Sequence, residues 1–134
     1  MGSDPQPDFS TPEGAVRALE DAYRRKDVEG AVGAKSFRHE AELMLQSVNP
    51  DLANDEEVVS ETARALELSF RSQIAESGFR DFTGVTTSFP ECEIRSQSLI
   101  VLTEVCTHVD GRSSTERLMV AKTSLGWRVL NPLE

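Results

Sequence analysis

The chain has little cysteine: its 134 residues include only Cys92 and Cys106. Two cysteines are too few for the disulfide framework of a small secreted domain. No Cys/His spacing resembles a zinc site, so we predict neither a metal nor a cofactor. A cross-strand disulfide between Cys92 and Cys106 is one alternative. Two buried free thiols are our expectation, because a reducing compartment keeps thiols free.

Positive charge is also scarce. The chain has 14 Lys and Arg against 23 Asp and Glu, a net charge of −9. Nucleic-acid binding needs a basic face, so we expect no nucleic-acid partner, whereas a basic protein partner would suit this charge. No apolar run approaches the ~20 residues of a membrane-spanning helix. The start of the chain lacks the basic and apolar regions of a secretory signal, so we expect a cytoplasmic protein with no membrane contact, unless a leader has been removed.

Helical signals occupy the first half of the chain. After a Pro/Asp-rich extended arm (residues 1–9), a helix is predicted up to Arg25. Its start is either Thr11 as cap or a capping box of Ser10 and Glu13. Asp27 is predicted to cap a short second helix.

Two further helices follow at helical spacing. Apolar residues at 37, 41, 44, 45 and 48 predict the buried face of a helix over residues 36–48. Those at 59, 63, 66, 70 and 74 predict a longer helix that begins with Asn54 as cap and ends at Gly78.

The apolar period changes to two after Gly78, which indicates strands. Residues 82–89 are predicted to form a strand that ends at Pro90, a proline suited to a bulge or an edge strand. Three more are predicted at 99–109, 115–123 and 127–130, the first two joined by a turn at Asp110 and Gly111. Helices first and an antiparallel meander last predict an α+β fold, with residues 10–134 as one domain.

Three stretches carry a family resemblance: Thr11–Val16, Lys26–Val32 and Gly126–Leu130. In their order and spacing they resemble the nuclear transport factor 2-like (cystatin-like) superfamily. The resemblance implies N-terminal helices packed into a curved antiparallel sheet, a cone with a pocket, and a homodimer formed through the sheet.

The middle of the chain departs from the enzymes of this superfamily. In ketosteroid isomerase and similar polyketide cyclases, a strand with the catalytic carboxylate soon follows the second helix. Here residues 36–48 read as helix instead. In this respect the chain looks closer to uncharacterised bacterial branches, some of which resemble immunity proteins or accessory binding domains.

Glu104 and His108 are the candidate catalytic residues, since they share one face of the strand 99–109 with Cys106 between them. If this face lines the cone, desolvation would raise a carboxyl pKa there. Alternatively the face is an outer or dimer surface, with Glu104 paired to Lys122 or Arg128.

Candidate ligand-binding residues are Cys106, Glu116 and Trp127. Glu116 is expected on the same face of the next strand, and Trp127 either lines a pocket or packs in the core. The cluster of Arg38, His39 and Glu40 is interpreted as a solvated face, because adjacent helical residues diverge by about 100°.

Two functions follow as hypotheses. The favoured one is a non-enzymatic binding domain. Its ligand is either a protein partner, such as the toxin bound by an immunity protein, or a small apolar molecule in the cone. The alternative is a small isomerase, dehydratase or cyclase in which Glu104 or His108 is the general base.

Overall fold

The computed structural model describes residues 8–132, so most of the predicted arm (residues 1–9) lies outside the described residues. Helices precede strands, and the predicted α+β class is confirmed. The helices are α1 (Pro12–Arg25), α2 (Val28–Gly33), α3 (Phe37–Val48), α4 (Pro50–Ala53) and α5 (Glu56–Ser77). The strands are β1 (Thr86–Ser96), β2 (Leu99–Thr107), β3 (Ser113–Thr123) and β4 (Gly126–Pro132).

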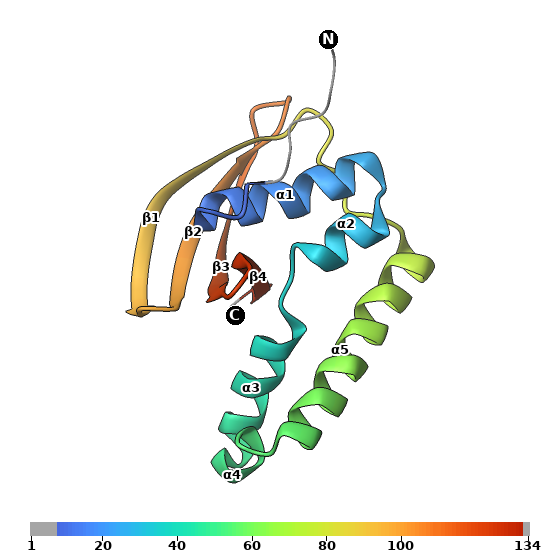
Figure 1. Ribbon diagram of the computed structural model, residues 1–134. Helices are drawn as coiled ribbons and strands as arrows, with labels where there is room; N and C mark the ends of the chain where they lie inside the picture. The colour runs from blue at the N-terminus through green and yellow to red at the C-terminus, as the bar shows by residue number, and fades with distance from the viewer. Residues whose placement is uncertain (1–7, 133–134) are drawn as a thin grey trace.

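The strands form one antiparallel sheet in the order β1-β2-β3-β4. In Figure 1 the sheet is bent, α1 lies across one of its faces, and α3, α4 and α5 extend beyond the sheet as a helical hairpin. The inner face of β2, which points toward α1, bears Ile100, Leu102, Glu104 and Cys106, all buried. With Val16 on α1 and Leu118, Val120 and Val129 on the sheet, the first two form the main core.

β1 begins at Thr86 and continues through Pro90 to Ser96, so the predicted strand over residues 82–89 is wrong at both ends. Pro90 lies where its pairing with β2 shifts register, between Ser88 and Glu91, so this edge proline sits at a bulge as predicted. Cys92 faces Leu102 in the register, and both cysteines are free. Cys92 is exposed, so the expectation of two buried thiols is wrong for it.

The helix starts follow short-range hydrogen bonds. Thr11 caps α1 by accepting from the Gly14 N–H at 3.0 Å, which confirms the first of the two predicted starts. Asp27 caps α2 as predicted. The predicted Asn54 cap of α5 is wrong: Asp55 accepts from the N–H groups of Glu57 and Val58 instead. The reason is α4, a short helix missed in the sequence, whose C-terminal cap is Asn54.

The hairpin of α3 and α5 has a small core of its own, centred on Ala41, Leu45 and Val59. The predicted buried face of α3 is only partly correct, because Met44 is 46 % exposed and Val48 is 74 % exposed. These two residues lie on a helix that packs mainly on α5 and α4, so its apolar stripe extends past the surface that covers it.

Backbone from elsewhere in the chain covers part of the outer edge of β4. The Trp127 N–H donates to the Phe9 carbonyl at 2.8 Å, and the Val129 N–H donates to the Ala34 carbonyl at 2.8 Å. The Ser36 N–H in turn donates to the Val129 carbonyl. Within residues 8–132, no helix is both long and apolar enough to span a membrane.

Candidate functional site

A pocket of about 380 Å³ lies between α1, the C-terminal half of α5 and the inner face of the sheet. Its apolar wall includes Leu19 on α1, Phe70 and Ile74 on α5, and Phe79 in the segment that follows α5. Its polar lining includes Glu20, Lys35, Arg80, Glu104 and Glu116. An apolar cavity with a few convergent polar groups is the usual form of a small-molecule site.

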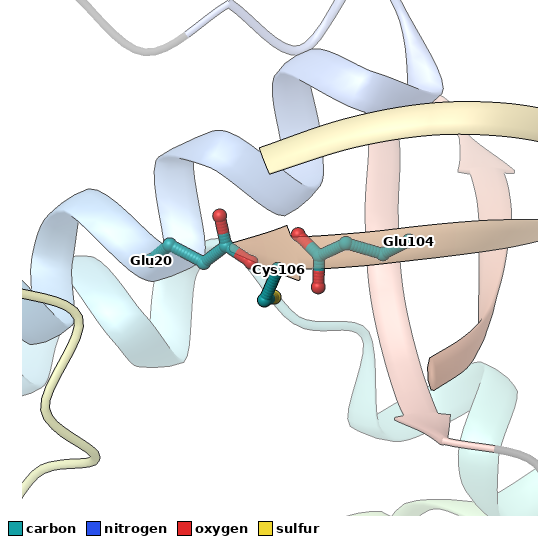
Figure 2. Close-up of side chains that lie close together, drawn as sticks. All are labelled: Glu20, Glu104 and Cys106. Atoms are coloured by element: carbon teal, nitrogen blue, oxygen red, sulfur yellow. The ribbon is translucent and has the colours of Figure 1, made fainter. Parts of the chain in front are cut away.

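Two acidic side chains meet at the wall of this pocket. Glu20 from α1 and Glu104 from β2 are buried, with 3 % and 1 % exposure. Figure 2 shows their carboxyl groups pointing toward each other, with Cys106 beside them. The potential ligand atoms of these three side chains all lie within 4.8 Å of one another.

The two carboxyl groups share a proton. Burial, the hydrogen bond to Glu104 and the charge of Glu104 together raise the pKa of Glu20 to about 9, against the opposing charges of Arg24 and Arg80. Like charges this close cannot both ionise without a large cost. Glu20 therefore stays protonated at neutral pH and donates to Glu104.

One oxygen of Glu104 has no ordinary donor. Apart from the protonated Glu20 carboxyl, no group in the described part of the chain donates a hydrogen bond to its buried Oε2. A buried acceptor of this kind costs about 1–3 kcal/mol unless it is satisfied. The proton held with Glu20 satisfies one acceptor position, and a donor on a ligand would satisfy more.

The neighbouring acid, Glu116, has a different arrangement. It faces Glu104 directly across β2 and β3. Arg80 reaches its Oε1 at 2.9 Å, so the Glu116 carboxylate has a cation of its own at the pocket lining.

A buried ion pair lies elsewhere in the lining. The Lys35 Nζ is 3.6 Å from Glu40, and both side chains are 6 % exposed. Burial lowers the pKa of Lys35, and the charge of Glu40 opposes that effect. The interpretation of Arg38, His39 and Glu40 as a solvated face is therefore wrong for Glu40. The predicted divergence of His39 from Glu40 is correct, because His39 turns away from Glu40 and its Nδ1 lies 2.7 Å from Ser36 Oγ.

Cys106 is a buried thiol. Burial and the nearby charges of Glu104 and Glu20 together raise its pKa to about 12. It is therefore a neutral thiol at physiological pH, not a nucleophile. With Glu20 and Glu104 it forms the one group of three potential metal donors among residues 8–132. A metal there would have to displace the shared proton and ionise this thiol.

The structure separates the two predicted catalytic candidates. Glu104 lies on the inner face, so the alternative of an outer face paired with Lys122 or Arg128 is wrong. His108 is exposed in the turn after β2, where its N–H donates to the Arg112 carbonyl. It does not converge with Glu104, because β2 ends at Thr107 and the alternation of faces ends with it.

The three predicted ligand-binding residues have different positions. Glu116 lines the pocket, whereas Cys106 lies beside it within the carboxyl cluster. Trp127 is half-buried against the main core and is not among the residues that line this pocket.

Glu20 is the site residue that sequence reasoning missed. It lies four residues after Val16 and three before Tyr23, on the side of α1 that faces the sheet. An acidic residue among apolar ones at helical spacing is the signal that could have identified it.

No family model, curated protein or solved structure matches this chain. The resemblance to the nuclear transport factor 2-like superfamily therefore stays a prediction.

Proposed function

We propose that this chain is a binding domain for a small, largely apolar molecule that enters the pocket beside Glu20 and Glu104. The observation that supports this most is the buried Glu104 carboxyl at the wall of a cavity of about 380 Å³, with one oxygen that has no donor apart from Glu20. That volume is within the range of pockets for small ligands, roughly 300–1,000 Å³. Keeping two buried acids together serves no packing purpose, since an apolar pair would fill the same space at lower cost.

An uncharged fluorescent probe, N-phenyl-1-naphthylamine, tests this proposal. We expect its emission to rise and shift to the blue with the native protein. Ile74→Trp on α5 should weaken its affinity by about tenfold or more, because the larger ring narrows the pocket. Leu19→Trp narrows the pocket from α1 and should act in the same way.

Leu68→Trp is the matched control, since Leu68 lies on the same helix, is 59 % exposed and is not part of the pocket lining. Equal binding by all three variants would contradict the proposed site.

A second candidate function, an enzyme that transfers protons, is favoured by the shared proton itself. The Glu104 carboxylate would remove a proton from a carbon next to a carbonyl group, and the Glu20 carboxyl would donate its proton to the carbonyl oxygen. Reversal at the same or another carbon would return both protons. Deuterium exchange into cyclohexanone, followed by NMR, tests it: a rate above buffer that Glu104→Gln lowers by about 100-fold would support an enzyme.

The predicted protein partner and the predicted homodimer through the sheet are not needed for either function. Both stay predictions, and light scattering at high protein concentration tests the second.

A further inference from the structure

Among the charged side chains that line the pocket, only Glu20 and Glu104 lack an ion-pair partner among the described residues. Both cations in the lining have a carboxylate of their own: Lys35 lies 3.6 Å from Glu40, and Arg80 lies 2.9 Å from Glu116. Glu20 and Glu104, by contrast, form no ion pair with any described residue. A buried acid without a basic partner is uncommon, because the interior offers nothing that replaces its hydration.

We infer that the Glu20–Glu104 pair recognises an organic ammonium group, so that the ligand of this pocket is a small amine with an apolar body. This inference rests on the proposed binding function and adds the chemical class of the ligand. An ammonium supplies both the missing positive charge and up to three donors for a carboxyl pair in which the Glu104 Oε2 has no donor apart from Glu20.

The rest of the pocket suits the apolar part of such a ligand. Leu19, Ile74 and Phe79 give it an apolar wall. The faces of Phe70 and Phe82 already hold cations of the chain, Lys35 at 4.8 Å and Arg80 at 5.0 Å from the ring centroids. The carboxyl pair is thus the position left for a cation from the ligand.

Binding exchanges one cation for another. Before binding, Glu20 is a protonated carboxyl group, Glu104 is a carboxylate and the ligand is R–NH₃⁺. In the complex both carboxylates contact the ammonium, and the proton of Glu20 leaves to the solvent. The titratable and charged groups that face the pair are Arg24 and Tyr23 on α1, Arg80 before β1, Cys106 on β2 and Glu116 on β3.

Three probes of similar shape test the inference by calorimetry on the full chain near neutral pH: 2-phenylethylamine, 2-phenylethanol and phenylacetate. We expect the amine to bind at least about tenfold more tightly than the alcohol, and phenylacetate more weakly than either. Measurements in two buffers of different ionisation enthalpy should show release of up to one proton per amine bound.

Variants separate the carboxyl pair from the rest of the surface. Glu104→Gln should reduce amine affinity to that of the alcohol, and Glu20→Gln, which removes the exchangeable proton, should abolish proton release. Glu61→Gln, an exposed position on α5, is the control and should change neither. Circular dichroism establishes that each variant is folded, and the Glu20 variant tests the inference if the Glu104 variant is not.

Failure of this inference is distinguishable from failure of the proposed function. If the naphthalene probe binds but the amine has no advantage over the alcohol, the inference is wrong and the pocket remains. If neither the probe nor any of the three ligands binds, both are wrong. Cobalt(II) binding with a thiolate charge-transfer band that Cys106→Ser abolishes, without amine binding, would make the cluster a metal site and overturn the inference.

Discussion

Glu104 on β2 and Glu116 on β3 are directly opposite each other, yet they turn to different partners. Glu116 pairs with Arg80, whereas Glu104 shares a proton with Glu20. Two like charges directly opposed across strands destabilise a sheet. Here Arg80 beside Glu116 and the proton between Glu20 and Glu104 reduce that repulsion. Because Glu20 is protonated, a cationic ligand can displace its proton, whereas Glu116 is already paired with a cation of the chain.

The first prediction concerns stability and pH. The pKa of Glu20 is about 9 in the folded chain, against an ordinary value of 4.5, so the folded state binds more protons between these two values. The stabilisation is complete below about pH 4.5 and is lost as pH rises through about 9, with a slope of at most ~1.4 kcal/mol per pH unit. Urea unfolding from pH 5 to 9 should show this fall.

Glu20→Gln removes the titrating group and should flatten that part of the pH dependence, while Glu61→Gln should leave it as in the native chain. Parallel pH curves for the native protein and Glu20→Gln would show that Glu20 has an ordinary pKa.

The second prediction concerns the cost of the buried acids. Replacing both by leucine, Glu20→Leu with Glu104→Leu, should raise the free energy of unfolding near neutral pH by about 1–3 kcal/mol, because an apolar pair avoids the desolvation of a carboxylate. Chemical denaturation measures it. The double variant should bind neither amine nor alcohol preferentially, and a stability loss of similar size would mean that the carboxyl pair holds the fold together.

The third prediction distinguishes the two thiols. Cys92 is exposed and Cys106 is buried with its pKa raised to about 12, so a disulfide reagent should titrate one thiol in the native protein and both after denaturation. Cys92→Ser should leave no reactive thiol in the native state. Rapid reaction of Cys106 in that variant would contradict its burial.

The fourth prediction tests the start of α5. Asp55→Ala should lower the free energy of unfolding by about 1 kcal/mol, because two N–H groups of the first turn lose their acceptor. Hydrogen exchange of the amides of Glu57 and Val58 should accelerate. Asn54→Ala is the matched control and should have a smaller effect on the free energy of unfolding. A larger effect of Asn54→Ala than of Asp55→Ala would mean that Asn54 caps α5, as the sequence indicated.

Much of the fold is readable from the sequence because its signals are local. Thr11, Asp27 and Gly78 act within a few residues of their own positions, and so does the turn at Asp110 and Gly111. The α5 cap failed by one residue for a local reason too, since α4 takes up Asn54. Helices first and strands last then suffice for the α+β class.

The site was only half predictable because it depends on how α1 lies on β2. Strand alternation identified Glu104, but nothing near it in sequence shows that Glu20, 84 positions earlier, would meet it. His108 failed because alternation predicts a face only while the strand continues, and β2 ends before it. The burial of Glu40 likewise depends on its pairing with Lys35, which packs on Phe70 of the distant α5.

The proline and bulge in β1 have a consequence for how copies of this chain can associate. A free outer strand is a template on which another chain can extend the sheet, and proline, a bulge and acidic side chains such as Glu91 and Glu93 all interrupt such growth. Backbone contacts from Phe9 and the segment before α3 occupy part of the opposite margin. Two molecules that associated through this sheet would therefore pack face to face rather than edge to edge, and a concentrated solution should resist fibril formation.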